Sequence, residues 1–180
     1  MLEQPNSTLA YNRQQQPSIQ NRPLRVCWAN VGRSSPCHIT ILEVAFQRGM
    51  DVVCVQEPFT CANSRTSTHP GFRHFAPIST WNTPSATGSE RPRVITYVRK
   101  SRHLHYQTRE SLNHPDLLWV VVNRVSILNC YRQAHNQDVL QYVTHLTPPE
   151  HCLIGGDFNL KHETFEPGVA ATDGGIELAR

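Results

Sequence analysis

After its polar N-terminal stretch, the first half of the sequence contains two short apolar runs with one amphipathic segment between them. Residues 24–29 and residues 52–55 are apolar runs typical of buried strands. Between them, apolar residues recur near helical spacing, at Ile39, Leu42, Ala45 and Phe46. The pattern predicts a strand, a helix and a second strand, which is the opening of an α/β fold.

Local signals place the ends of this helix. Ser35 can cap the N-terminus, and Pro36 suits the first helical position because its missing N–H has no helical partner there. Gly49 suits the C-terminal stop, since glycine adopts positive φ without steric cost. We therefore expect the helix to start at Pro36 and to end just before Gly49.

The second half predicts more strands and at least one further helix. A hairpin is expected from residues 117–122 and 125–131, with Asn123 and Arg124 as its two-residue turn. Asp138 can cap a helix that ends before Pro148. The other expected strands are residues 72–75, 94–98 and 151–154, and the expected loops are residues 60–70 and 79–92.

Composition sets the domain limits. Residues 1–22 are polar and rich in Gln, Asn, Ser and Pro, so we expect a disordered tail followed by one domain over residues 23–180. The formal net charge of +3 permits an anionic partner without requiring one. The chain has no run of about 18 apolar residues and no Cys-x-x-Cys pair among its six cysteines, so we expect a soluble, reduced, intracellular protein without membrane contact.

Polar residues mark the ends of four expected strands. They are Asn30, Glu57, Tyr131 and Asn159, with Asp157 two residues before the last. Ligand-binding groups gather at strand ends in α/β sheets. Two glycines before Asp157 allow close backbone packing, and an extended strand would put Asp157 and Asn159 on one side.

These side chains suit phosphodiester hydrolysis. Carboxylate oxygens bind Mg²⁺, with Mn²⁺ as an alternative, so Glu57 is the expected main metal ligand and Asn30 lies close to the metal. Asp157 can orient the attacking water, and Asn30, Tyr131 and Asn159 can donate to phosphate oxygens. The alternatives are ordinary: Asn30 and Asp157 as turn residues, Tyr131 as a half-buried aromatic, and Glu57 as a solvated acid.

Four segments in order resemble motifs of the endonuclease/exonuclease/phosphatase superfamily. They are residues 27–32 (Cys-Trp-Ala-Asn-Val-Gly), 55–58 (Val-Gln-Glu-Pro), 128–132 (Leu-Asn-Cys-Tyr-Arg) and 154–159 (Ile-Gly-Gly-Asp-Phe-Asn). Residues 91–100 and 165–168 are similar to segments in endonuclease domains of non-LTR retrotransposons, especially fungal ones. The resemblance spans about residues 24–180.

The resemblance implies a four-layered α/β/β/α sandwich of the pancreatic-DNase-like type. It also implies a divalent metal, the site residues named above and nicking of DNA, in the nucleus if the chain is part of a retroelement. Family members continue into strands that carry a catalytic Asp and a Ser-Asp-His motif, whereas this sequence ends at Arg180. We therefore expect an incomplete sandwich and little or no nicking by residues 1–180.

Two further questions stay open from the sequence. Basic residues could bind the DNA backbone or could protect a solvated strand edge, and they are Arg91, Arg93, Arg99, Lys100 and Arg102. His162 is near the site in sequence, but we expect it to be a loop residue. The alternative functions are a lipid or inositol phosphate phosphatase of the same superfamily, and an inactive remnant or binding module.

Overall fold

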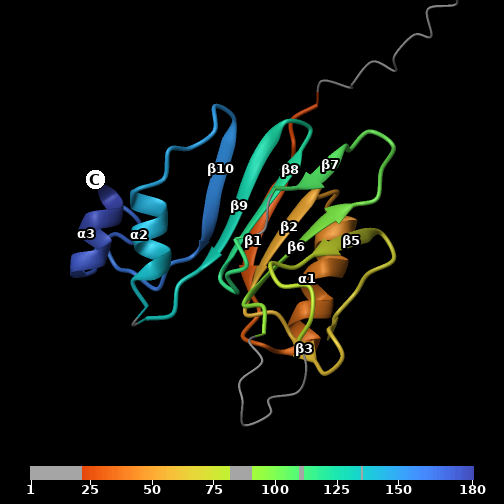
Figure 1. Ribbon diagram of the computed structural model, residues 1–180, viewed down its shortest axis with the longest axis horizontal. Helices are drawn as coiled ribbons and strands as arrows, with labels where there is room; N and C mark the ends of the chain where they lie inside the picture. Colours follow the sequence, from red (N-terminus) through yellow and green to blue (C-terminus); the bar gives the residue numbers. More distant parts are fainter. Residues whose placement is uncertain (1–21, 82–90, 110–111, 135) are drawn as a thin grey trace, which may run out of the picture.

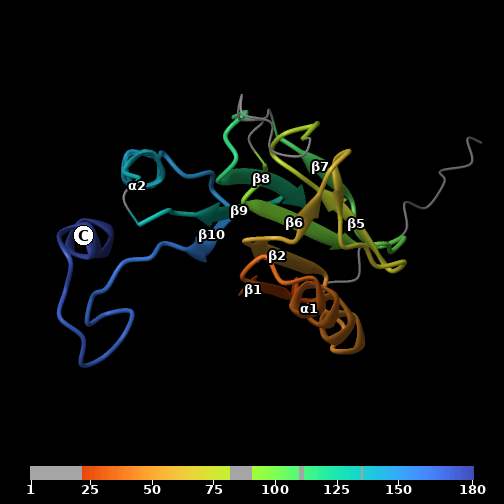
Figure 2. The ribbon, with the colours of Figure 1, turned by 90° about the horizontal axis from the view of Figure 1, so that it is seen from below.

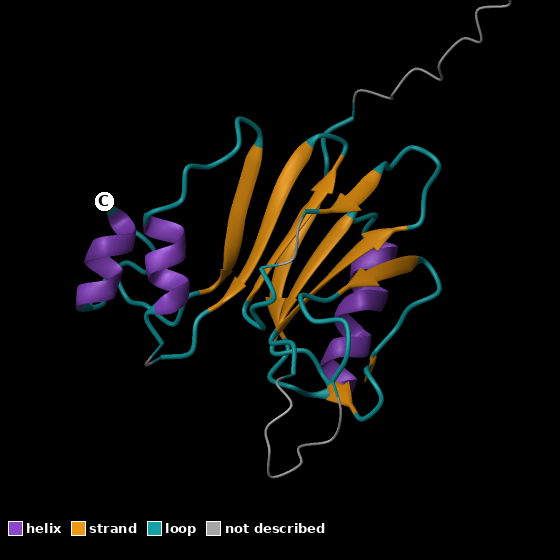
Figure 3. Cartoon of the chain, in the orientation of Figure 1, coloured by secondary structure: helices purple, strands orange, loops and turns teal. Residues whose placement is uncertain are grey.

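Two four-stranded sheets packed face to face form the centre of the molecule (Figures 1 and 3). The computed structural model describes residues 22–81, 91–109, 112–134 and 136–180. The expected tail, apart from residue 22, and most of the expected loop at residues 79–92 therefore lie outside the described residues.

The first sheet has the order β1-β2-β6-β5. Its strands are β1 (Val26–Asn30), β2 (Val52–Gln56), β6 (Val94–Arg99) and β5 (Phe72–Phe75). β1 and β2 are parallel and are joined through helix α1 (Ser35–Gln47), which confirms the predicted strand–helix–strand opening. β6 runs antiparallel to both of its neighbours.

The second sheet has the order β10-β9-β8-β7. Its strands are β10 (Cys152–Asp157), β9 (Val125–Tyr131), β8 (Leu117–Val122) and β7 (Tyr106–Thr108). β8 and β9 form the predicted hairpin, and β10 lies parallel to β9. A small hairpin, β3 (Thr60–Cys61) with β4 (Arg65–Thr66), stands apart from both sheets within a segment predicted as a loop.

Three apolar clusters separate four layers. One lies between the sheets, one between the first sheet and α1, and one between the second sheet and helix α2 (Asp138–Thr144). Figure 2 shows α1 below the first sheet, and the C-terminal helix α3 (Asp173–Ala179) lies beside α2 in Figure 1. The α/β fold is confirmed, and the layer order agrees with the expected sandwich.

Some element ends differ from the prediction by one residue. Ser34, not Ser35, caps α1, and its hydroxyl accepts a hydrogen bond of 3.3 Å from Cys37 N. Asp138 is the first residue of α2 rather than its cap, which is Gln137. The side chain of Asn136 accepts a hydrogen bond from Asp138 N at 2.8 Å. Gly49 follows α1 with φ +70°, as predicted.

A buried amide bridge joins the two sheets. Gln56 Nε2 donates to Asn129 Oδ1 at 2.5 Å, and both side chains are almost fully buried. Asn129 Nδ2 in turn lies 3.3 Å from Val55 O and 3.2 Å from Ile95 O. Since buried polar groups cost free energy unless they are bonded, this bridge favours one relative position of β2 and β9.

Arg22, at the end of the expected tail, forms an ion pair with the buried carboxylate of Asp51. No helix in the described ranges is long and apolar enough to cross a membrane. The six cysteines are free thiols, and burial raises the pKa of Cys130 to about 12.

Candidate active site

Four of the predicted residues converge where strands of both sheets end. Asn30 is the last residue of β1, Glu57 follows β2, Tyr131 ends β9 and Asp157 ends β10. Within each sheet a parallel pair, β1 with β2 and β9 with β10, puts two of these carboxyl ends side by side. The packing of the sheets then brings the two pairs together.

Asn30 connects the two carboxylates. Its Nδ2 donates to Glu57 Oε1 at 3.1 Å and to Asp157 Oδ2 at 2.8 Å. Its Oδ1 accepts from Gly32 N at 2.8 Å, so the amide oxygen points away from the carboxylates. In this arrangement Asn30 positions both acids, and its oxygen is not presented as a metal ligand.

Glu57 has an unusual backbone conformation. Its φ is +45°, in the left-handed region that non-glycine residues rarely adopt and that costs about 1–2 kcal/mol. Backbone hydrogen bonds hold it there: Glu57 N donates to Arg93 O at 2.9 Å, and Arg33 N donates to Glu57 O at 2.7 Å. Strain of this kind, maintained by surrounding contacts, is typical of functional positions.

Tyr131 supports the Glu57 carboxylate from the second sheet. Its hydroxyl donates to Glu57 Oε1 at 2.8 Å. Burial, together with the neighbouring charges of Glu57 and Asp157, raises the pKa of Tyr131 to about 12. The phenol therefore stays protonated at neutral pH and remains a hydrogen-bond donor.

Close packing explains the two glycines before Asp157. A Cβ on Gly155 would lie 2.6 Å from the indole of Trp28, and one on Gly156 would lie 1.8 Å from Cys130 O. Both positions therefore require glycine for β10 to approach β9 and β1 this closely. The approach places Asp157 within hydrogen-bonding distance of Asn30.

Asn159 lies next to the other four but is oriented differently. Its φ is +49°, so the chain is not extended there and the predicted strand alternation with Asp157 does not apply. Its backbone N–H donates to Asp157 Oδ1 at 3.0 Å, and its Nδ2 donates to Arg132 O at 2.6 Å. Asn159 thus holds the Asp157 carboxylate through its backbone.

The donor set suits one weakly held hard cation. Glu57 and Asp157 offer carboxylate oxygens, which Mg²⁺ prefers, and Mg²⁺ keeps much of its hydration when protein ligands are few. No cluster of three or more His, Cys, Asp or Glu residues able to hold a metal exists among the described residues. The carboxylates of Glu57 and Asp157 are the side chains at this site that could hold such a cation, with water as the remaining ligands.

A groove of about 750 Å³ opens beside these residues. It runs between the edge strands β1 and β10 and the segment before α3. Asn30, Asp157 and Asn159 line one end, and aromatic rings such as Trp28 and Phe165 line the rest. Of the two predicted carboxylates, Asp157 therefore faces a space large enough for a ligand, whereas Glu57 does not line this groove.

The predicted basic patch divides between the two ends of β6. Arg91 and Arg93 lie beside Glu57, whereas Arg99 and Lys100 lie at the opposite end, where they contact Asp51 and Gly71 through the backbone. The sheet brings only the first pair to the candidate site, because a six-residue strand separates the two groups.

The side chain of Arg99 already has partners. It donates to Met50 O at 2.8 Å and to Phe46 O at 2.7 Å, and its guanidinium lies 4.4 Å from the centroid of the Phe46 ring. Arg99 therefore caps the C-terminal end of α1. Arg102 is exposed in the loop after β6.

His162 is a loop residue, as expected. Its Nδ1 accepts from Thr164 N at 3.1 Å, and its ring packs 5.7 Å from that of Phe165. The contacts are local to the loop.

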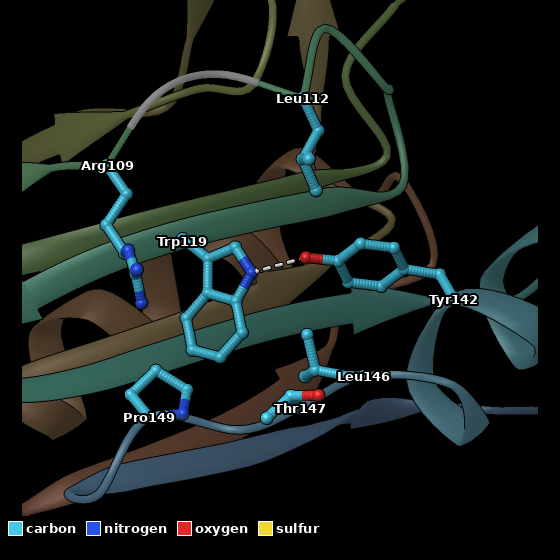
Figure 4. A pocket seen from close by; sticks show the side chains of 7 residues that line it. All are labelled: Arg109, Leu112, Trp119, Tyr142, Leu146, Thr147 and Pro149. Carbon is cyan, nitrogen blue, oxygen red and sulfur yellow. Dashed lines mark hydrogen bonds between the residues drawn. The ribbon is translucent and has the colours of Figure 1, made fainter.

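A second cavity, of about 440 Å³, lies on the outer face of the second sheet (Figure 4). Trp119 Nε1 donates to the hydroxyl of Tyr142 at 2.8 Å, and the Arg109 guanidinium lies 5.6 Å from the Trp119 ring centroid. None of the five predicted site residues lines this cavity, so it is separate from the candidate site.

Sequence reasoning missed three residues around the site. Arg33, predicted only as part of a turn, has its Nε 3.6 Å from Glu57 Oε2. Gln56 and Asn129 form the amide bridge directly behind Glu57 and Tyr131. Their positions next to the predicted site residues in sequence were the available signal, but the contact between them depends on how the sheets pack.

Comparisons with known proteins bear on the family and the fold of this chain. The family model described as "Endonuclease/Exonuclease/phosphatase family" matches residues 27–177. The chain is similar to the endonuclease domain of TRAS1, a telomere-specific non-LTR retrotransposon, with TM-score 0.67 and 19% identity over 87% of this chain and 68% of that one. The comparison with curated proteins gives no match.

Two other solved structures are more distant. AP endonuclease LMAP from Leishmania major gives TM-score 0.55 and 13% identity over 83% of this chain and 59% of that one. Humanized D. rerio TDP2 gives TM-score 0.46 and 14% identity over 79% of this chain and 65% of that one. This chain thus spans less than two thirds of either, and the likeness to AP endonuclease LMAP concerns the fold.

Proposed function

Because this chain belongs to the endonuclease/exonuclease/phosphatase family, we propose that it carries the site of a metal-dependent phosphodiesterase that acts on DNA. The observation that carries the proposal is the Asn30 amide, which holds the carboxylates of Glu57 and Asp157 together at the ends of both sheets. Two carboxylates held side by side by a neutral donor suit this chemistry, because one can hold a cation and the other can hold a water next to the same phosphate.

Glu57 is the residue that would hold the metal, which would supply positive charge to a phosphate oxygen. Tyr131 and Asn30 both donate to Glu57 Oε1, so this carboxylate is oriented before any cation binds. Oε2 faces Arg33 at 3.6 Å, a distance too long for a strong hydrogen bond and short enough for attraction. Because Oε1 already accepts two hydrogen bonds, Oε2 has more capacity left for a cation once the Arg33 guanidinium turns away.

Asp157 orients the attacking water and takes its proton. Asn30 Nδ2 and Asn159 N each donate to one of its oxygens, which fixes the plane of the carboxylate. A carboxylate can accept about four hydrogen bonds, so capacity for a water remains. A positioned base of this kind contributes roughly 10²–10⁴ in rate.

DNA is the proposed substrate class. It is supported by the basic residues Arg91 and Arg93 next to Glu57 and by the likeness to the TRAS1 endonuclease domain. A fold likeness alone does not determine the substrate, so the basic side chains beside the acids carry this part of the proposal. If the chain is part of a retroelement, its place of action is the nucleus.

Nicking of supercoiled plasmid with Mg²⁺ or Mn²⁺ tests the proposal. The assay uses residues 1–180 and a chimera in which the C-terminal sheet region of a retrotransposon endonuclease domain follows Arg180. We expect nicking by the chimera, lost in Asp157→Ala and retained in Asp173→Ala, where an exposed acid of α3 is removed. The same gels test the sequence-based prediction that residues 1–180 nick weakly.

Two results would contradict the proposal. One is nicking that persists unchanged in Asp157→Ala, because the base would then lie elsewhere. The other is a folded chimera that releases phosphate from inositol phosphates but leaves plasmid intact, which would assign the site to a phosphatase.

A further inference from the structure

A separate cleft of about 450 Å³ is lined by Glu57, which does not line the groove. The segment of residues 57–60 and three arginines, Arg33, Arg91 and Arg93, line this cleft. The arginines come from two distant parts of the chain, the turn after β1 and the segment before β6. Their meeting at one cleft is therefore a property of the fold.

The side chain of Arg91, which lines this cleft, is anchored by a hydrogen bond. Its Nη1 donates to Thr60 O at 3.1 Å, which anchors the guanidinium to β3. Its Nε is buried and has no hydrogen-bond partner within the described part of the chain. A buried charged donor without a partner is costly, so this group has capacity for an anion that reaches it.

Arg33 lies at the mouth of the cleft. It occupies a tight turn in which Gly32 and Arg33 have φ of +54° and +57°, closed by Ser34 N donating to Val31 O at 3.0 Å. The turn fixes its backbone, while 69% of its side chain is exposed. Its guanidinium can therefore swing between Glu57 and a ligand in the cleft.

Arg93 is the third arginine that lines the cleft. It forms a paired ion bridge with Asp116, whose carboxylate is fully buried, with Nη2 2.7 Å from Oδ2. The pairing keeps Arg93 rigid and offsets its charge. The cleft still has more guanidinium groups than carboxylates along its lining, so its potential attracts anions.

We propose that this cleft binds a backbone phosphate of the DNA strand adjacent to the phosphodiester held at Glu57. The inference deepens the proposed function and rests on it, because it makes a polymer carrying several phosphates the substrate class. Guanidinium groups match phosphate oxygens with paired hydrogen bonds. A cleft that adjoins the metal ligand is positioned for the next phosphate of a bound strand rather than for the one that is cleaved.

Salt-dependent binding of DNA tests the assignment. Fluorescence anisotropy with a fluorescein-labelled 20-base-pair duplex, in EDTA and with rising KCl, is compared for the unmodified chain, Arg91→Gln and Arg33→Gln. We expect each substitution to weaken binding roughly fivefold at low salt and to reduce the slope of log K against log [salt] by about 1. Arg102→Gln, at the far end of β6, is the matched control and should change neither.

The proposal is overturned if the slope of log K against log [salt] is the same for Arg91→Gln and Arg33→Gln as for Arg102→Gln. Because Arg33 is exposed, its variant separates loss of phosphate binding from loss of folding, and thermal melts of all variants check this. Vesicles containing phosphatidylinositol phosphate form the second arm: Arg91-dependent retention on vesicles without duplex binding also overturns the DNA assignment.

Failure of this inference can be distinguished from failure of the proposed function. Binding is measured with Glu57 and Asp157 intact and with no divalent metal, so a chain that nicks no plasmid can still show the Arg91-dependent slope. Conversely, Asp157-dependent nicking with unaltered slopes in both arginine variants removes this inference and leaves the proposed function standing.

Discussion

The side-chain amide of Asn30 lies 2.8 Å from the carboxylate of Asp157, although 127 positions separate the two residues in sequence. Asn30 ends β1 and Asp157 ends β10, so each lies at the edge strand of a different sheet. The same amide also contacts Glu57. One neutral side chain therefore holds both acids in place at the ends of their strands.

Replacing Glu57 with glutamine should weaken Mg²⁺ binding by at least about tenfold, because a charged oxygen ligand is lost. Isothermal titration calorimetry at constant ionic strength gives the dissociation constant. Glu150→Gln, which removes one charge from the exposed loop before β10, is the control and should bind as the unmodified chain does. Equal affinities for the two variants would exclude Glu57 as the main ligand.

The raised pKa of Tyr131, about 12, predicts a loss of stability in alkali. Since the folded state holds this proton more tightly than the unfolded chain, whose tyrosine pKa is about 10, the contribution is complete below pH 10 and disappears as the pH rises through 12. Urea unfolding of the unmodified chain should therefore show a steeper decline above pH 10 than unfolding of Tyr131→Phe.

Parallel declines for the two chains would contradict this assignment. The comparison with Tyr131→Phe is necessary because burial also raises the pKa of Tyr97. Tyr97 therefore contributes a loss of stability in alkali that both chains share.

Arg99→Gln should destabilise the fold by about 2 kcal/mol, since it removes charge-assisted hydrogen bonds to the end of α1. Urea unfolding measures the change. The affinity for the labelled duplex should stay within twofold of that of the unmodified chain, because Arg99 lies at the opposite end of β6 from Glu57. A large loss of DNA affinity with unchanged stability would restore Arg99 to the DNA-binding surface.

Asn129→Leu should cost about 3 kcal/mol, because the substitution leaves the buried Gln56 amide and nearby carbonyl oxygens without their partner. Chemical unfolding provides the free energy. Gln141→Leu, at an exposed position of α2, removes an amide of similar chemistry and should change stability by less than about 0.5 kcal/mol. Similar losses for both would mean that the bridge contributes no more than a surface amide.

The sequence was sufficient to predict that polar residues at strand ends lie close together, because strands and their ends have clear apolar patterns. It was not sufficient to predict the orientation of Asn30, whose oxygen turns to Gly32 N, or the left-handed backbone of Glu57. Both depend on contacts from distant segments. The expected basic patch illustrates the same limit, because Arg91 and Arg99 are close in sequence but lie at opposite ends of the extended strand β6.

The amide bridge between Gln56 and Asn129 has a consequence for the kinetics of folding. Its partners are 73 positions apart, so the bridge closes only when β2 and β9 come together. Contacts of such long sequence separation form late and slowly, because the chain must first lose the entropy of a large loop. Mg²⁺ affinity that depends on Glu57 should consequently appear in the last kinetic phase of refolding, after most of the secondary structure has formed.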